Sequence, residues 1–140
     1  MISEFRGEFS FLSNFYPCGV ELDNLVFPTV EHAFQAAKTT NMDDRLFISM
    51  LDTPGQAKRA GRKVTLRPGW DDIKIHVMRY LLHQKFAQEP FHSLLLATGE
   101  QHIEEGNAWG DRFWGVSPVG SGNGQNMLGR LLMQVRREIE

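Results

Sequence analysis

The stretch DDIKIHVMRYLLHQKFA, residues 71–87, constrains the fold most, because its apolar residues recur at the spacing of one helix face. The residues on this face are Ile73, Val77, Leu81 and Leu82. A second amphipathic helix is predicted over residues 125–139, and Pro68-Gly69 marks the entry to the first one. Two helices of this kind must bury their apolar faces, so the chain is expected to build a helical core.

Shorter elements are predicted between and before these helices. Residues 18–29 have two apolar stretches around Asp23-Asn24, which indicates a hairpin. Further helices are expected from Val30, over residues 43–51, after the Thr53-Pro54 cap, and over residues 90–99. HIEEG and FWGV are typical of strand or extended loop. The prediction is an α+β fold, a mostly helical single domain over residues 1–140 with a few short strands.

Composition excludes several classes of protein. The formal net charge is -2, with 15 basic and 17 acidic residues, so the chain lacks the polycationic surface of a bulk nucleic-acid binder. Cys18 is the only cysteine, which excludes an intrachain disulfide and fits a reducing compartment. No signal peptide and no apolar run of about 20 residues is present. A cytoplasmic protein without membrane contact is expected.

Glu31, Gln35 and Lys38 form a polar stripe in the segment FPTVEHAFQAAK, residues 27–38. Their spacing of four and three residues stacks a carboxylate, an amide and an amine along one side of a helix. Thr29 is a plausible N-cap, and a glutamate in the first turn is favoured by the helix dipole whatever its function. The stripe therefore indicates either a capping and solvated role or a site where three groups converge.

Aromatic and polar residues collect in two other segments. FLSNFYP, residues 11–17, places Asn14 beside Phe15, and EEGNAWGDRFWGV, residues 104–116, has several candidate contacts. Those contacts are Asn107, Trp109, Asp111 and Trp114. Aromatic faces beside amides and carboxylates suit a pocket for a planar heterocycle, although tryptophans also fill cores.

A glycine-rich segment, GVSPVGSGNGQNMLG, residues 115–129, leads into the last predicted helix. Backbone amides at a helix N-terminus bind anions, so Gly120, Gly122 and Gly124 are candidate phosphate ligands, with a plain connector as the alternative. The segment lacks the Gly-Lys-Ser/Thr ending of a Walker loop. The histidines have no metal-ligand spacing, so no metal and no cofactor are expected.

Four segments in order resemble the NADAR family, also called YbiA-like: FLSNFYP, FPTVEHAFQAAK, GNAWGD and NMLGRLLMQVR. The resemblance runs from about residue 5 to residue 137 and implies a compact, mostly helical α+β fold. It also implies an N-glycosidase acting on ribosides. Two substrate classes are described for the family: ribosylamino-pyrimidine phosphates of riboflavin synthesis, and ADP-ribosylated guanine in nucleic acid.

The resemblance also suggests roles for individual residues. Glu31 matches the active-site glutamate, Asp111 would bond the leaving base or the sugar, and Trp109 would stack on the base. Breaking the C1′–N bond creates positive charge on ribose, which a carboxylate stabilises. Lys38 would neutralise phosphate or attack C1′ of a ring-opened ribose. The remaining expected contacts are Asn14 and Phe15 on the base side and Arg6 with the 120–124 loop on the phosphate side.

Two rival functions use the same sequence differently. A non-catalytic sensor of NAD or ADP-ribose would need the aromatics and the loop but gains little from Glu31 and Asp111 together. A helical protein-interaction module would make no use of the glycine loop. The cluster Lys58, Arg59, Arg62 and Lys63 is either a solvated helix face or a rim that steers a phosphorylated substrate.

Overall fold

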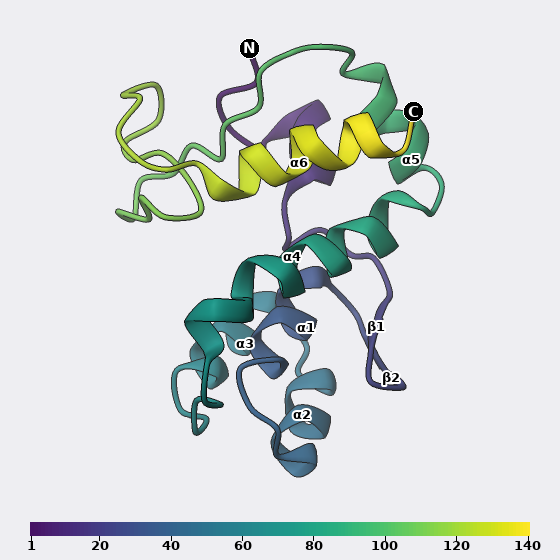
Figure 1. Ribbon diagram of the computed structural model, residues 1–140, viewed down its shortest axis with the longest axis vertical. Coiled ribbons are helices and arrows are strands. Elements are labelled where there is room, and N and C mark those ends of the chain that lie inside the picture. Colours follow the sequence, from purple (N-terminus) through teal and green to yellow (C-terminus); the bar gives the residue numbers. More distant parts are fainter. The chain divides into compact units, whose positions relative to one another are not determined.

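The computed structural model describes residues 1–140 and confirms an α+β chain in which helices dominate (Figure 1). Its α-helices are α1 (Val30–Ala36), α2 (Met42–Ser49), α3 (Pro54–Gly61), α4 (Trp70–Phe86), α5 (Phe91–Ala97) and α6 (Met127–Glu138). The strands are β1 (Val20–Leu22) and β2 (Leu25–Phe27), and η1 (Gly7–Leu12) is a 3-10 helix that the sequence did not predict. No helix is long and apolar enough to cross a membrane.

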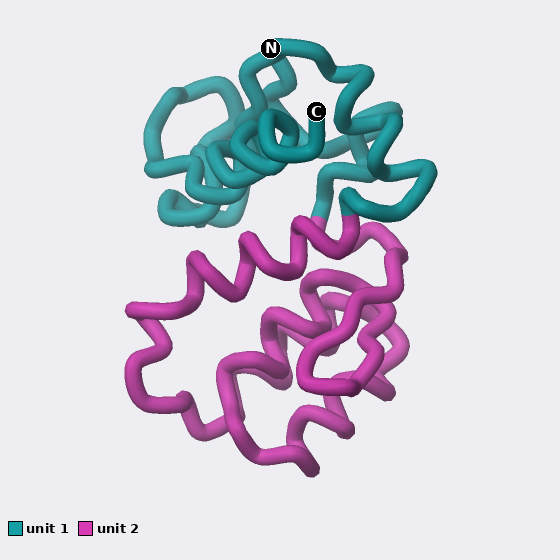
Figure 2. Tube along the Cα trace, turned by 45° about the vertical axis from the view of Figure 1, so that its right-hand side comes forward, with its two compact units in different colours: residues 1–13, 86–140 teal, residues 14–85 magenta.

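The chain divides into two compact units (Figure 2). Unit 1 contains residues 1–13 and 86–140, and unit 2 contains residues 14–85. No composition shift, repeat or linker marks this division in the sequence. The expectation of one domain over the whole chain stays a prediction.

Unit 2 is built around α1. The hairpin β1–β2 pairs Val20 with Phe27 in antiparallel register and turns at Asp23 and Asn24, both in the left-handed region, with φ of 50° and 67°. Asn tolerates this region, which explains the turn that the sequence predicted. Helices α2 and α3 and both strands pack on α1, and every residue of α1 is buried.

The helix boundaries follow local capping chemistry. Thr29 caps α1 by accepting a hydrogen bond from the His32 amide, as predicted. Thr53 and Gln56 form a capping box at α3, with Pro54 in the first turn. α1 ends at Ala36, so Lys38 lies just beyond the helix. The predicted stripe had placed Lys38 on the helix itself, together with Glu31 and Gln35.

Unit 1 combines α5, α6 and η1 with long loops. Isolated parallel bridges join Ile2 to Ile103 and Gly106 to Val116, so HIEEG is an extended segment, as expected, without forming a sheet. FWGV differs from the expectation, because residues 113–115 bend and only Val116 forms a bridge. The apolar face of α6 is buried through Leu128, Leu131, Leu132 and Val135. The amides of Met127 and Leu128 at the start of α6 donate to the carbonyls of Phe113 and Trp114, which ties the preceding loop to this helix.

Candidate active site

Helix α1 is fully buried but carries three polar side chains. Glu31 is 7% exposed, His32 1% and Gln35 4%. A buried polar group costs free energy unless it is hydrogen-bonded, so each of these residues needs a structural or functional reason. The solvated role considered for Glu31 is excluded by this burial.

His32 has a structural reason. Its Nε2 lies 3.0 Å from the Leu51 carbonyl oxygen, and its Nδ1 lies 2.7 Å from the Thr29 hydroxyl. A carbonyl only accepts, so Nε2 carries the proton and Nδ1 accepts from Thr29. Burial lowers the pKa of His32, which agrees with this neutral form. His32 therefore ties the start of α1 to the end of α2.

Glu31 and Gln35 form a pair one helical turn apart. Gln35 Nε2 donates to Glu31 Oε1 over 3.2 Å, while the buried Gln35 Oε1 has no hydrogen-bond partner. The amide packs against Gly61 of α3, where an added Cβ would stand 1.9 Å from Gln35 Oε1. The predicted proximity of carboxylate and amide is thus present, and it depends on a glycine in a neighbouring helix.

Lys38 completes the polar group of unit 2. Burial lowers the pKa of Lys38, Glu31 opposes this shift, and Arg62, Lys58 and Lys74 add to it through charge repulsion. Its Nζ also lies 6.0 Å from the centre of the Phe34 ring. The charge of Glu31 acts on Lys38, so the two side chains lie in the same part of unit 2 although Lys38 lies beyond the end of α1.

The basic cluster separates into two pairs. Lys58 on α3 and Arg62 directly after that helix act on the charge of Lys38. Arg59 and Lys63 are exposed and do not appear among those influences. One half of the cluster therefore belongs to the surroundings of Lys38, and the other half is a solvated face.

Asn14 and Phe15 also belong to unit 2. The Asn14 carbonyl accepts from the Glu31 amide over 3.1 Å, which places this backbone at the start of α1. Asn14 Nδ2 contacts Met78 Sδ at 3.6 Å, and its buried Oδ1 has no hydrogen-bond partner. Phe15 is 42% exposed, so it is no core residue. Substrate contacts for both stay predictions.

In unit 1 the GNAWGD segment is a loop fastened by Asn107. Asn107 is 2% exposed, and its Nδ2 donates to Glu105 Oε2 and to the Asp111 carbonyl, each over 2.9 Å. Its Oδ1 accepts from the Asp111 amide at 3.1 Å. Because these bonds use most of the amide's capacity, Asn107 chiefly shapes the loop.

Asp111 also bonds within the loop. Its Oδ1 accepts from the amides of Phe113 and Trp114, at 3.1 and 2.9 Å. The Trp114 ring packs edge-on against Phe113, with ring centres 4.8 Å apart. Catalysis by Asp111 and substrate contact by Trp114 stay predictions, and both residues have a local structural role as well.

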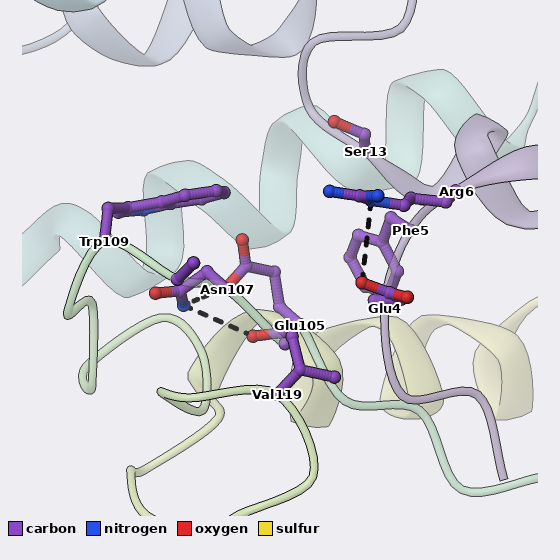
Figure 3. Close-up of a pocket in the computed structure, with 10 residues that line it drawn as sticks. Glu4, Phe5, Arg6, Ser13, Glu105, Asn107, Trp109 and Val119 are labelled. Atoms are coloured by element: carbon purple, nitrogen blue, oxygen red, sulfur yellow. Dashed lines mark hydrogen bonds and ion pairs between the residues drawn. The ribbon is translucent and has the colours of Figure 1, made fainter.

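Trp109 lines a pocket in unit 1 (Figure 3). It is 65% exposed, which excludes the core position considered for it. The polar residues around this pocket are Glu4, Arg6, Ser13, Glu105 and Asn107. Arg6, expected to bind phosphate, is exposed and pairs with Glu4 at 3.6 Å. The pocket thus joins the N-terminal segment to the 104–119 loop.

The start of α6 differs from the expected anion site. The amides of Met127 and Leu128 donate to the carbonyls of Phe113 and Trp114, at 3.0 and 2.9 Å. Asn126 before them is left-handed, with φ of 51°, and makes no side-chain cap. The prediction that the first amides of this helix point outward, free to bind an anion, is therefore wrong, because carbonyls of the preceding loop accept their hydrogen bonds. Phosphate contacts by Gly120, Gly122 and Gly124, all exposed and all at positive φ, stay predictions without that support.

No group of three His, Cys, Asp or Glu residues is arranged to hold a metal ion. His102, for example, pairs with Glu104 at 3.2 Å on the surface. Two further residues, Glu105 and Lys85, were not predicted from the sequence. Glu105 follows another glutamate, Glu104, and the sequence does not distinguish the two. Lys85 is fully buried. Its spacing of four and three residues from Leu81 and Leu82 places it on the apolar face of α4, and this spacing is visible in the sequence.

Comparisons with known proteins agree with this architecture. The NADAR domain model matches residues 3–140. The chain is 37% identical to the N-glycosidase YbiA of Escherichia coli, over 98% of this chain and 84% of that protein. It is 37% identical to an N-glycosidase of Nostoc punctiforme, over 91% of this chain and 83% of that protein.

A longer relative shares only part of its length. A riboflavin biosynthesis protein of Vibrio vulnificus is 38% identical over 93% of this chain, and the chain spans 35% of that protein. The NMR structure of E. coli YbiA matches with a TM-score of 0.82 and 34% identity, covering 99% of this chain and 86% of that one. The order of elements, the motifs and these matches together show that the chain belongs to the NADAR domain family of N-glycosidases.

Proposed function

We propose that this chain is an N-glycosidase that hydrolyses the C1′–N bond of phosphorylated N-ribosides. The observation that carries the proposal is the polar group on the buried helix α1: Glu31 bonded to Gln35, with Lys38 in its electrostatic field. Relatives named N-glycosidase and riboflavin biosynthesis protein support the class of reaction. The substrates proposed are ADP-ribosylated guanine in nucleic acid and ribosylamino-pyrimidine phosphates.

Glu31 stabilises the positive charge that develops at C1′ as the bond to nitrogen lengthens. A carboxylate that is 7% exposed acts in a medium of low dielectric, where its charge has a larger effect than in water. The Gln35 amide holds one carboxylate oxygen, so Glu31 is oriented before substrate arrives. Glu31 then takes a proton from the attacking water.

In a second route, which replaces direct attack by water, the Lys38 amine attacks the same carbon. In a ribosylamino compound the ribose ring opens to an imine, and a neutral lysine adds to C1′ and expels the base as an amine. Water then hydrolyses the Lys38 imine, which releases the sugar aldehyde and restores the amine. The lowered pKa of Lys38 supports this role, because it enlarges the neutral fraction.

Lys58 and Arg62 are proposed to bind the substrate phosphate. Both act on Lys38 through their charge, and lysine and arginine side chains are common phosphate ligands in proteins. No step in this scheme is assigned to a metal. Phosphate bound here would also oppose the repulsion that these cations exert on Lys38.

Glu31→Gln tests the carboxylate. The change keeps shape and removes charge, so base release from a ribosylamino-pyrimidine phosphate should fall about 100-fold or more while ligand binding is retained. The released base is measured by chromatography, beside a parallel reaction on an ADP-ribosylated guanine oligonucleotide. Base release near the wild-type rate in a folded Glu31→Gln protein would reject the catalytic assignment of Glu31, whereas a wild type that binds ligand and releases no base would favour the ADP-ribose sensor.

Borohydride trapping tests the amine. Reduction during turnover should add the mass of the sugar to Lys38, and Lys38→Ala should give no adduct. Lys63→Ala is the control, since Lys63 is an exposed residue on the solvated half of the basic cluster. An active enzyme that never forms the adduct would limit Lys38 to binding phosphate.

A further inference from the structure

The turn that precedes α4 contacts the end of α1, and both belong to unit 2. This turn, residues 67–70, reads Arg-Pro-Gly-Trp, and Trp70 is the first residue of α4. Gly69 has φ of 74°, which suits the third position of a turn with proline before it. Proline and a left-handed glycine restrict the backbone between Arg67 and Trp70, so these two residues are held at a fixed spacing.

Arg67 holds the backbone at Lys38. The Arg67 amide donates to the Lys38 carbonyl over 2.7 Å, and Nη1 of its guanidinium donates to the Ala37 carbonyl over 3.4 Å. Both carbonyls follow the last residue of α1, where a helix leaves carbonyls without a partner of its own. Arg67 therefore satisfies two carbonyls at the end of α1 from a position 30 residues beyond Ala37.

Trp70 packs against the aromatic ring next to the Lys38 amine. The ring centres of Trp70 and Phe34 are 5.2 Å apart, with 53° between the ring planes, and both side chains are buried. The Lys38 amine lies over the Phe34 ring, 6.0 Å from its centre. Because buried rings in contact pack closely, Trp70 limits the movement of the ring that supports the amine.

The Lys38 side chain has few other restraints. It is half-buried, and its amine donates no hydrogen bond and forms no ion pair within the protein. A lysine has a flexible four-carbon stem, so the place of an amine without such a partner depends on the backbone and on what the stem packs against. Arg67 fixes the backbone, and the Phe34 ring backed by Trp70 supports the stem.

The contact made by Arg67 is distinct from the electrostatic influences on Lys38. The charged groups that act on Lys38 come from α1, from α3 and the residue after it, and from α4: Glu31, Lys58, Arg62 and Lys74. Arg67 is not among them, so it acts on Lys38 by placement and not by charge.

We propose that the turn of residues 67–70 positions the Lys38 amine, with Arg67 as the positioning residue for its backbone and Trp70 for the Phe34 ring beside it. The inference rests on the proposed function, because it assigns the turn to the amine that attacks C1′. A Lys38 side chain released from these contacts spends less time within attack distance of a bound ribose. Neither Arg67 nor Trp70 is assigned a contact with substrate.

Arg67→Met tests the side-chain contact, because methionine keeps an unbranched stem and removes the donors. Lys38 is acetylated with a limiting amount of reagent over a range of pH and quantified by peptide mass spectrometry, with the exposed Lys63 as the reference in the same sample. The reagent attacks only neutral amines, so the midpoint of the profile reports the pKa of Lys38. Burial lowers that pKa, so a released and better solvated Lys38 should show a higher midpoint.

The same variant should lower kcat for base release about 10-fold, because each unit of upward shift reduces the neutral amine at pH 7 by about 10-fold. KM should change by less than about 2-fold, since the proposed phosphate ligands Lys58 and Arg62 are unchanged. Arg67→Lys should restore both the midpoint and kcat, because an ammonium group also donates to the Ala37 carbonyl.

Arg59→Met is the matched control. Arg59 is an exposed arginine on α3, and its charge is not among those that act on Lys38. This variant should keep the wild-type midpoint and kcat. If Arg67→Met does not fold, Trp70→Phe, which reduces the support of the Phe34 ring, replaces it with the same expected shift.

An Arg67→Met protein with the wild-type midpoint would overturn the inference, even with a lower kcat, because the loss would then come from a general change in structure. Failure of Arg67→Lys to restore the midpoint would overturn it as well. If the wild type releases no base, the proposed function fails, and the labelling midpoint alone decides whether the turn positions Lys38.

Discussion

At the scale of single residues, Asp111 has two separable properties. Its Oδ1 accepts hydrogen bonds from the amides of Phe113 and Trp114, and its carboxylate charge is what the predicted catalytic role requires. An asparagine keeps the acceptor and loses the charge. Substitution can therefore distinguish a loop-holding role from a catalytic one.

Asp111→Asn should lower base release about 100-fold while the free energy of unfolding changes by less than ~1 kcal/mol. Asp111→Ala, which removes both hydrogen bonds, should lose stability as well. Turnover and urea unfolding of the two variants measure these effects. An Asp111→Asn protein as active as the wild type would leave Asp111 with its structural role alone.

Lys85 is a fully buried lysine whose Nζ lies 5.9 Å from the centre of the Tyr16 ring. Burial lowers its pKa to about 8, and the nearby Cys18 opposes the shift. Below pH 8 both the folded and unfolded states hold the proton, so the full cost of burying the charge is present. Between pH 8 and the ordinary value of 10.5 the unfolded state binds more protons, so stability rises with pH.

Lys85→Met should therefore stabilise the protein at pH 7 by on the order of 1 to 3 kcal/mol, with the advantage shrinking as pH rises toward 10. Urea unfolding at pH 7 and pH 9.5 measures the difference between wild type and variant. Lys63→Met, at an exposed position, should show no comparable pH dependence. A Lys85→Met advantage that is constant with pH would mean that the buried amine keeps its proton at both pH values, so that burial has not lowered its pKa.

At the scale of elements, the contact between α1 and α3 sets the position of Gln35. Gly61 ends α3 with no side chain, and the Gln35 amide fills the space where its Cβ would be. Gly55 in the first turn of the same helix has no atom closer than 3.9 Å to an added Cβ. The two glycines form a matched pair, since alanine improves helix propensity at both.

Gly61→Ala should displace the Gln35 amide, destabilise the protein by about 1 to 3 kcal/mol and lower turnover, because Glu31 loses its orienting partner. Gly55→Ala should stabilise by up to about 1 kcal/mol with normal turnover. Thermal unfolding and base release on both proteins test the pair. Equal effects at the two positions would argue against a close contact between Gly61 and Gln35.

At the scale of the whole molecule, charge is distributed unevenly although the formal net charge is only -2. In unit 2, Lys58, Arg62 and Lys74 act on Lys38, whereas carboxylates are in excess in the unit 1 pocket. In the proposed scheme the cations of unit 2 bind the substrate phosphate. This task is not assigned to a metal.

EDTA should accordingly leave base release unchanged, because the chain has no group of three metal-ligating side chains. The assay compares turnover before and after chelation, with a known zinc hydrolase in parallel to show that chelation is complete. Activity lost in EDTA and restored by one added metal would refute the metal-free scheme.

The sequence by itself determined what depends on local chemistry: the caps at Thr29 and Thr53, the Asp23-Asn24 turn, and the periodicity of α4 and α6. Only the tertiary structure decided which polar groups are buried, because burial depends on partners far along the chain. Gly61 fixes Gln35 from another helix, and loop carbonyls occupy the amides of Met127 and Leu128 that looked available for phosphate. Glu105 could not be told from Glu104 by sequence, since only the contact with Asn107 and the space left by Gly115 separate them.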